Sequence, residues 1–310
     1  MIGCYEHLHR YPSVFQSLTG LRLKEFEVLL RDVLPRYEAA EAKRLARPER
    51  QRQPGGGRES ALAPLDQRLL VIIWLRQYPT HEVLGYLFGV SDSTVSRLIA
   101  RIVPLLEASG RDTMRMPDPG RKRRRQLDDL LRDTPELAVV IDSFEQRVQR
   151  PKQRAAADTY YSGKKKQHTL KSQGAVDEET GEIVDVSASV CGPTHDLALF
   201  RQSGLAARLP AGVGAVGDLG YVGLPEELPV GLAATPRRKP RGQPRPAEDV
   251  AYNTAFSRRR IIVEHSIGRI RRFQAVTQPD RHHRLHHHAR GVAIVGLVNR
   301  QLRHHRPYAA

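Results

Sequence analysis

The sequence is poor in cysteine, has no long apolar run and is short of acidic residues. Only Cys4 and Cys191 occur among its 310 residues, which excludes a disulfide-rich secreted scaffold and favours a reducing cytosol. No apolar run approaches the roughly 18 residues that a membrane-spanning helix needs. The N-terminus also lacks the basic-then-apolar pattern of a signal peptide. We therefore expect a cytoplasmic protein that does not enter a membrane.

The shortage of acidic residues gives the chain a strongly basic character. Lys and Arg number 50 against 34 Asp and Glu, for a net charge of +16 and a pI near 10.3. Such a charge imbalance indicates which partners a protein binds and says little about its fold. Nucleic acid is the leading expected partner, and an anionic membrane surface is the second. The preference for Arg over Lys and the many alanines suggest a GC-rich gene, and so a bacterial source.

The pattern along the chain predicts two domains, which the length also allows. Residues 1–110 have apolar residues at helical spacing and are expected to form a helical domain. A basic linker is expected at 111–135, where Met-Pro-Asp-Pro-Gly precedes the run Arg121–Arg125. Residues 136–310 mix short β-rich runs with helices, which predicts an α/β domain. Within these regions we expect a polar Pro/Gly loop at 48–60, a hairpin at 165–190 that turns at Asp177–Gly181, and helices at 195–205, 253–273 and 286–303.

Residues 80–106 fit a helix-turn-helix. Gly85 is small where the two helices would cross, Gly89 can adopt the positive φ of the turn, and Ser91 is a good N-cap for the second helix. The N-terminal part of such a second helix enters the DNA major groove. The expected base-reading residues are Ser93, Thr94 and Arg97, with Arg101 facing outward toward phosphate. The alternative is an ordinary helical hairpin, because this motif also occurs in interaction modules.

Three segments carry acids in the order Asp, Asp, Glu. Two apolar runs, 137–142 and 213–218, read as strands that terminate in Asp142 and Asp218, and a helix amid arginines carries Glu264. Carboxylate oxygens are the ligands that Mg²⁺ and Mn²⁺ prefer. Two such ions about 4 Å apart can activate a water or hydroxyl and stabilise the leaving oxygen of a phosphodiester. Each acid alone is weak evidence, but in this order in a basic chain they predict a catalytic, metal-binding triad.

The other charged groups each have two interpretations, a functional role and an ordinary structural one. Lysines on the predicted hairpin and arginines on the Glu264 helix would hold phosphates near the acids, although lysine is also common at solvated strand edges. Five histidines between His282 and His288 include pairs at zinc-binding spacing, but a polar helix start explains them equally well. Acids in polar stretches, such as Glu178 and Glu179, read as solvated surface residues. The expected phosphate contacts are Lys164, Lys165, Lys166, Lys171, Arg260 and Arg271.

With these features in place, the second half of the chain resembles the DDE transposases of bacterial insertion sequences. The nearest group is the IS-five family with its Harbinger-like relatives. The matching stretches, in order, are 140–143, 163–171, 194–197, 217–223 and 260–268, of which Lys-Lys-Lys-Gln-His-Thr-Leu-Lys at 164–171 is the most telling. The resemblance implies a ribonuclease H-like fold with a mixed sheet, preceded by an all-α helix-turn-helix domain. In that fold the aspartates lie on adjacent strands and the glutamate on a late helix.

The family signature Tyr-x2-Arg-x3-Glu-x6-Lys is partly kept. Arg260 and Glu264 match it, whereas Ser257 replaces the tyrosine and Arg271 replaces the lysine. Arg271 keeps a phosphate-binding charge, but as a fork rather than a point donor. The loss of the tyrosine affects one DNA contact and leaves the metal site intact.

The resemblance implies metal-dependent cleavage at the ends of a mobile element and strand transfer into target DNA. It implies two Mg²⁺ or Mn²⁺ ions per site, double-stranded DNA as partner, and a homodimer or higher oligomer that acts at the nucleoid. Two alternatives remain at this stage: a helix-turn-helix regulator without catalysis, and a domesticated nuclease that no longer transposes. Inverted repeats flanking several gene copies would favour transposition.

Overall fold

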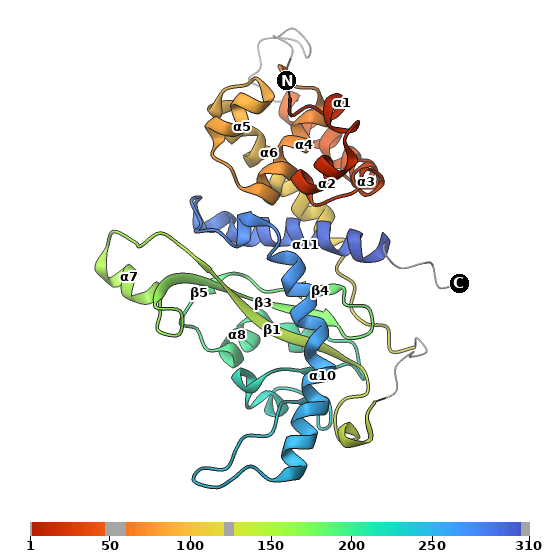
Figure 1. The fold of residues 1–310 in the computed structure, drawn as a ribbon, viewed down its shortest axis with the longest axis vertical. Helices are drawn as coiled ribbons and strands as arrows, with labels where there is room; N and C mark the ends of the chain where they lie inside the picture. The colour runs from red at the N-terminus through yellow and green to blue at the C-terminus, as the bar shows by residue number, and fades with distance from the viewer. Residues whose placement is uncertain (1, 47–59, 121–126, 305–310) are drawn as a thin grey trace. The chain divides into compact units, whose positions relative to one another are not determined.

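The structure is a computed structural model that describes residues 2–46, 60–120 and 127–304 (Figure 1). The chain divides into two compact units. Unit 1 comprises Met1–Thr113, Arg272–Gln278 and Ala289–Ala310, and unit 2 comprises Met114–Arg271 and Pro279–His288. Of the expected segments, the Pro/Gly loop up to residue 59 and the basic run Arg121–Arg125 lie outside the described residues.

Unit 1 is helical, as predicted, and is built around one buried helix. All residues from Gln67 to Leu75 are buried, because an apolar surface all round a helix requires partners on every side. The helices are α1 (Tyr5–Leu8), α2 (Pro12–Thr19), α3 (Leu23–Leu45), the central α4 (Pro64–Gln77), α5 (His81–Phe88), α6 (Asp92–Arg111), the short η4 (Gln274–Val276) and α11 (His287–His304).

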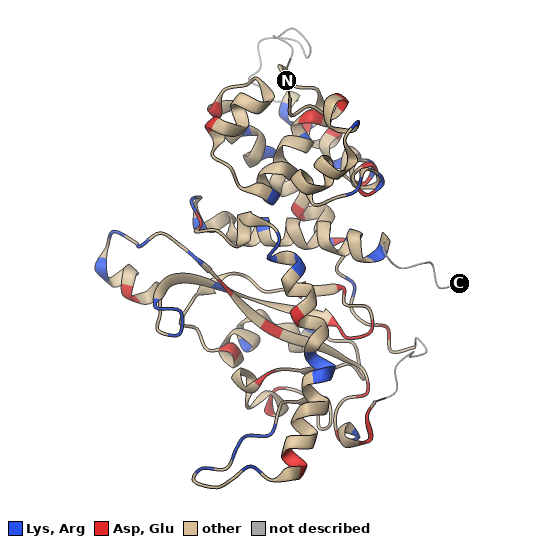
Figure 2. Cartoon of the chain, viewed as in Figure 1, with Lys and Arg blue, Asp and Glu red and all other residues tan. Residues whose placement is uncertain are grey.

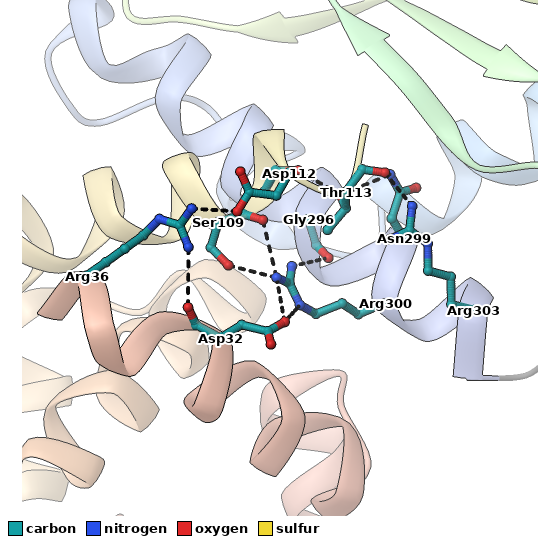
Figure 3. A network of polar contacts seen from close by, with 10 residues as sticks. Asp32, Arg36, Ser109, Asp112, Thr113, Gly296, Asn299, Arg300 and Arg303 are labelled. Carbon is teal, nitrogen blue, oxygen red and sulfur yellow. Dashed lines mark hydrogen bonds and ion pairs between the residues drawn. The ribbon is translucent and has the colours of Figure 1, made fainter. Parts of the chain in front are cut away.

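The C-terminal helix α11 belongs largely to unit 1, which differs from the expected single domain over residues 136–310. Gly296 on α11 and Gly110 on α6 approach so closely that a methyl group on Gly296 would overlap the Gly110 backbone. The Arg300 guanidinium donates to Asp32 at 3.0 Å and to the Ser109 hydroxyl at 2.7 Å, and Asn299 donates to the Thr113 hydroxyl at 3.2 Å (Figure 3). Residues at opposite ends of the sequence therefore share one polar network.

Unit 2 contains a mixed sheet. Its strands are β1 (Ala138–Arg147), β2 (Tyr161–Ser162), β3 (Gln167–Asp177), β4 (Ile183–Val186), β5 (Val190–Cys191), β6 (Gly214–Val216) and β7 (Ala233–Ala234), in the order β2-β3-β1-β6-β7, with β4 and β5 also paired to β3. β1 runs antiparallel to β3 and parallel to β6. The predicted hairpin is confirmed, since β3 and β4 are antiparallel neighbours and Gly181 turns between them at φ +66°. The mixed sheet confirms the predicted α/β class.

Helices flank this sheet and close its core. They are α7 (Arg154–Tyr160), α8 (Asp196–Ser203), α9 (Leu205–Arg208) and α10 (Ala247–Ile270), with short 3₁₀ turns η1 (Asp129–Leu131), η2 (Leu219–Tyr221), η3 (Leu224–Glu226) and η5 (Arg284–His286). Val139 and Ile141 of β1 pack with Leu197 and Phe200 of α8 in one apolar core. Because side chains alternate along a strand, Asp142 points to the face opposite Val139 and Ile141. Helix α10 crosses β1 and β3 (Figure 1).

Among the helices that the structure describes, none combines the length and the apolar character that crossing a bilayer demands.

Candidate active site

Asp142 lies inside a strand rather than at its end, which corrects the expectation that the strand terminates there. β1 continues to Arg147 because β3 pairs with it along its whole length, from Val139↔Asp177 to Arg147↔Thr169. The parallel partner β6 is much shorter, and its pairing with β1 ends at Val140↔Val216. Beyond Val140, β1 is therefore no longer paired with β6, and Asp142 lies at this unpaired edge, next to the end of β6.

Asp218 follows β6 at this same edge. Continued in register, the pairing Val140↔Val216 would set Asp218 opposite Asp142. The Asp218 carboxylate accepts the backbone N–H of Gly220 at 2.8 Å and so caps the 3₁₀ turn η2. The sheet topology brings together two of the three predicted acids.

The charges of the two aspartates act on each other. Burial raises the pKa of Asp142, the nearby Arg260 guanidinium opposes this rise, and the negative charges of Asp218 and Asp196 reinforce it. The backbone N–H of Ser143 also donates to the Asp142 carboxylate at 2.9 Å. Two partly desolvated carboxylates that repel each other are suited to a hard divalent cation, which would relieve both effects.

Asp196, at the start of α8, is a third acid beside this pair. Its carboxylate accepts from the Ser143 hydroxyl at 2.8 Å and from the Lys171 ammonium at 3.1 Å. A methyl group on Gly220 would overlap an Asp196 oxygen and lie 2.9 Å from an Asp218 oxygen. Both carboxylates therefore lie next to Gly220. Asp196 was not among the predicted site residues. The available signal was an acid in the first turn of a helix within the stretch 194–197.

Lys171 has an internal role instead of the expected phosphate contact. It is buried, and its ammonium donates to the Thr194 carbonyl at 2.6 Å as well as to Asp196. It also lies 4.0 Å from Glu145. Lys171 therefore compensates acids beneath the site. The other three hairpin lysines, Lys164, Lys165 and Lys166, are exposed on the turn between β2 and β3.

Helix α10 presents Arg260 and Glu264 one turn apart on one face. Arg260 interacts electrostatically with Asp142, and its Nε is buried without a hydrogen-bond partner among the described residues. Glu264 is exposed. No three His, Cys, Asp or Glu side chains in the described part of the chain are grouped closely enough to hold a metal ion. The structure thus brings Asp142 and Asp218 together without joining Glu264 to them.

Tyr221 forms part of the site's apolar wall. It is fully buried, and its hydroxyl has no hydrogen-bond partner among the described residues. Burial raises the pKa of Tyr221, and the negative charges of Asp196, Asp142 and Asp218 raise it further. The phenol stays neutral beside the acids and lowers the local dielectric. Tyr221 was not among the predicted site residues.

The remaining arginines of α10 divide into two kinds. Arg259 is buried, pairs with Glu178 at 2.7 Å and donates to the Thr134 hydroxyl at 2.6 Å. It therefore cannot face DNA, and Glu178 is not the solvated acid that the sequence suggested. Arg258 and Arg271 are exposed, and Arg271 stands at the C-cap of the helix.

The helix-turn-helix has the predicted turn geometry. Gly89 adopts φ +65°, and the Ser91 hydroxyl caps α6 by accepting the Thr94 N–H at 3.2 Å. A methyl group on Gly85 would meet the Val90 carbonyl at 2.5 Å, so the close approach expected there is present.

The expected DNA-contacting side chains of α6 differ in how free they are. Ser93 and Arg97 are exposed and Thr94 is half-buried. Arg101, expected to face outward, instead pairs with Glu41 at 3.1 Å, donates to Gln67 and lies over the Tyr37 ring. Its charge is used within unit 1, because α3 covers this part of α6.

Two of the clustered histidines, His287 and His288, make contacts within unit 2. His287 is buried, with its two ring nitrogens 2.7 Å from the Gln146 side-chain oxygen and 2.6 Å from the Ser189 hydroxyl. His288 contacts the Ser187 carbonyl at 3.0 Å. These contacts give both residues a structural role.

Comparison with known proteins matches both parts of the chain. The family model described as DDE superfamily endonuclease matches residues 141–299, and the model described as helix-turn-helix of DDE superfamily endonuclease matches residues 60–112. A protein of Microchaete diplosiphon named "Probable transposase for insertion sequence element IS702" is 30% identical over 246 residues, which are 79% of this chain and 83% of that protein. No solved structure gives a significant match. The first match spans Asp142, Asp218 and Glu264.

Proposed function

This chain belongs to the family of DDE superfamily endonucleases, and on that premise we propose that it is a transposase. It cleaves DNA strands at the ends of a mobile element and joins them to target DNA, acting in the cytoplasm at the nucleoid. The observation that carries the proposal is the nearness of Asp142 and Asp218 just beyond the last β1–β6 pair, Val140↔Val216, where burial and like charge raise the pKa of Asp142. A regulator that only bound DNA would have no use for this costly arrangement.

The proposed cofactor is Mg²⁺ or Mn²⁺, two ions per site, held by Asp142, Asp218 and Glu264. When bound, such ions activate the attacking water or hydroxyl and stabilise the leaving oxygen of the phosphodiester. The donor set supports this choice, since the aspartates offer only carboxylate oxygens. Glu264 is the proposed third ligand because it follows the two aspartates in the order Asp, Asp, Glu on a late helix.

The chain's own residues prepare the site for this reaction. Lys171 and the Ser143 hydroxyl hold the Asp196 carboxylate, and the Gly220 N–H orients that of Asp218. Arg260 places a positive charge beside the acids, where a scissile phosphate needs compensation. Tyr221 excludes water from one wall.

The proposed DNA contacts divide between the two units. Ser93, Thr94 and Arg97 on α6 read the element's end, and their position at the N-terminal part of the second helix supports this role. Lys164, Lys165, Lys166, Arg260 and Arg271 hold backbone phosphates near the acids. Excision and joining involve two ends, so the active form is at least a dimer.

Strand cleavage by the full-length protein tests the assignment. A labelled duplex carrying the element's end is incubated with Mg²⁺ or Mn²⁺ and the wild-type chain. Asp142→Asn, Asp218→Asn and Glu264→Gln are each expected to abolish cleavage while end binding persists, because each removes an anionic ligand at nearly constant volume. Ca²⁺ is expected to support binding but little cleavage.

Matched controls use exposed acids away from the site, Asp129→Asn and Glu226→Gln, which are expected to cleave normally. Cleavage by Asp142→Asn near the wild-type rate, or full activity in excess chelator, would overturn the site. A wild-type chain that binds the end but never nicks it would favour a DNA-binding regulator.

A further inference from the structure

Within the described residues of unit 2, the loop between β7 and α10 is a long exposed segment rich in basic residues. Residues 235–246 contain five basic and no acidic residues, together with four prolines. Figure 2 shows the basic positions along this loop, ahead of the N-terminus of α10. Proline fixes φ and disfavours helix for the residue before it, so the four prolines restrict the backbone of this loop.

Arg237 fastens the base of the loop to α10. Its backbone N–H donates to the Asn253 side chain at 2.8 Å, and the Asn253 amide donates back to the Arg237 carbonyl at 3.0 Å. The Arg237 guanidinium pairs with Asp249 at 3.1 Å and lies 4.3 Å from the centre of the Tyr252 ring. This clasp uses the charge of Arg237 internally and fixes where the rest of the loop begins.

The other four cations of the loop have no such use. Arg238, Lys239, Arg241 and Arg245 are exposed, and in the described chain they form no hydrogen bond or ion pair. Gly242 turns the loop between them at φ +74°. Four unpaired cations on an anchored loop with a restricted backbone lower the entropy that binding an anionic backbone would cost.

The loop is connected at both ends to elements of the active site. β7 pairs with β6, which leads into Asp218, and α10 leads from the loop to Arg260. From Ala247 to Arg260 the helix advances by roughly 20 Å, at about 1.5 Å per residue. That span equals about six base pairs of B-DNA at about 3.4 Å each.

We propose that this basic loop binds the phosphate backbone of target DNA, without sequence preference, about half a helical turn from the reacting phosphodiester. The inference rests on the proposed function and deepens it. Target DNA is the occupant because the loop offers charge but no helix or strand to read bases, whereas the helix-turn-helix serves the element's end.

Duplex binding as a function of salt tests the loop separately from catalysis. The probe is a random-sequence 30-base-pair duplex, and the protein is the full chain with Asp142→Asn to prevent cleavage. Combined Arg238→Ala, Lys239→Ala, Arg241→Ala and Arg245→Ala should weaken binding at least tenfold at 0.15 M salt. The slope of log K against log salt should fall by up to about 3.6, or about 0.9 for each lost contact.

A matched control removes the same charge from unit 1, through Arg10→Ala, Lys24→Ala, Arg31→Ala and Lys43→Ala at exposed positions. It is expected to keep most of the affinity and slope. Replacing the three free loop arginines by lysine is also expected to retain the slope. An unchanged slope in the loop variant, or an equal loss in the control, would overturn the proposal. Failure of the transposase assignment would instead appear as wild-type protein that does not nick element ends.

Discussion

At the scale of single residues, the charged carboxylate of Asp142 destabilises the folded state. Its pKa is raised from the ordinary 3.8 because burial disfavours the charged form, and nearby acids add to this despite Arg260. The folded state therefore binds a proton more tightly than the unfolded state does. Stability falls as pH rises from about 3.8 to the raised pKa, and the full penalty persists at higher pH.

This linkage predicts that Asp142→Asn is more stable than the wild type at pH 7–8 in chelator. The gain should shrink as pH falls through the raised pKa and vanish below the unfolded value. Thermal denaturation from pH 3.5 to 8 measures it. Mg²⁺ should raise the melting temperature of the wild type much more than that of the variant, while Asp129→Asn should behave as wild type. A variant less stable at pH 8 without divalent ions would contradict this account.

The sequence identifies the acids better than it identifies their neighbours. Asp142 and Asp218 stand out because each follows a run that is apolar enough to be a buried strand. Asp196 and Lys171 do not, because their role depends on β3 lying beside β1 and on α8 starting next to Ser143. Those are pairings between distant segments, and no local pattern encodes them.

At the scale of elements, two arginines one turn apart on α6 have different surroundings. Arg97 is exposed, whereas Arg101 pairs with Glu41 and lies over Tyr37. Residues of the first turns of such a helix reach the major groove, and later ones pack against the domain.

Arg97→Ala is therefore expected to weaken binding to the element's end by roughly 1–3 kcal/mol, with a smaller loss on random DNA. Arg101→Ala should instead lower the thermal stability of the chain and leave the preference for the end over random DNA unchanged. Fluorescence anisotropy on both duplexes, with melting curves, separates the two. Equal losses on both DNAs for Arg97→Ala would reduce it to a phosphate contact.

Element types were predictable here, but some boundaries and partners were not. The cap at Ser91 and the turns at Gly89 and Gly181 depend on local chemistry, and the structure has them as expected. The end of β1 was misjudged because it is set by the length of β3. The assignment of α11 was missed because Arg300 and Asp32 are 268 positions apart.

At the scale of the whole molecule, the C-terminal helix completes the DNA-binding unit. Gly296→Ala would press a methyl group into the Gly110 backbone, an overpacking expected to cost roughly 1–3 kcal/mol. Gly291→Ala on the same helix meets open space and should stabilise by up to about 1 kcal/mol. The two variants are compared by their free energy of unfolding in chemical denaturant and by their affinity for the element's end. Loss of end binding in Gly291→Ala alone would contradict this packing.

Assembly on DNA gives the last prediction. Each chain has one Asp142–Asp218 pair in its described residues, whereas excision and joining require chemistry at two ends held together. With a net charge of +16, free chains repel one another, and DNA would neutralise that charge. We therefore expect a dimer or larger oligomer that forms on the element's ends and weakens steeply with salt.

Native mass spectrometry or light scattering of the full chain with end duplexes measures this stoichiometry. The expected complex holds at least two chains and two ends. Random duplexes of equal length serve as the control, because binding to backbone alone does not require paired ends. A cleavage-competent complex of one chain with one end would rule the dimer out while leaving the acid pair and its chemistry unaffected.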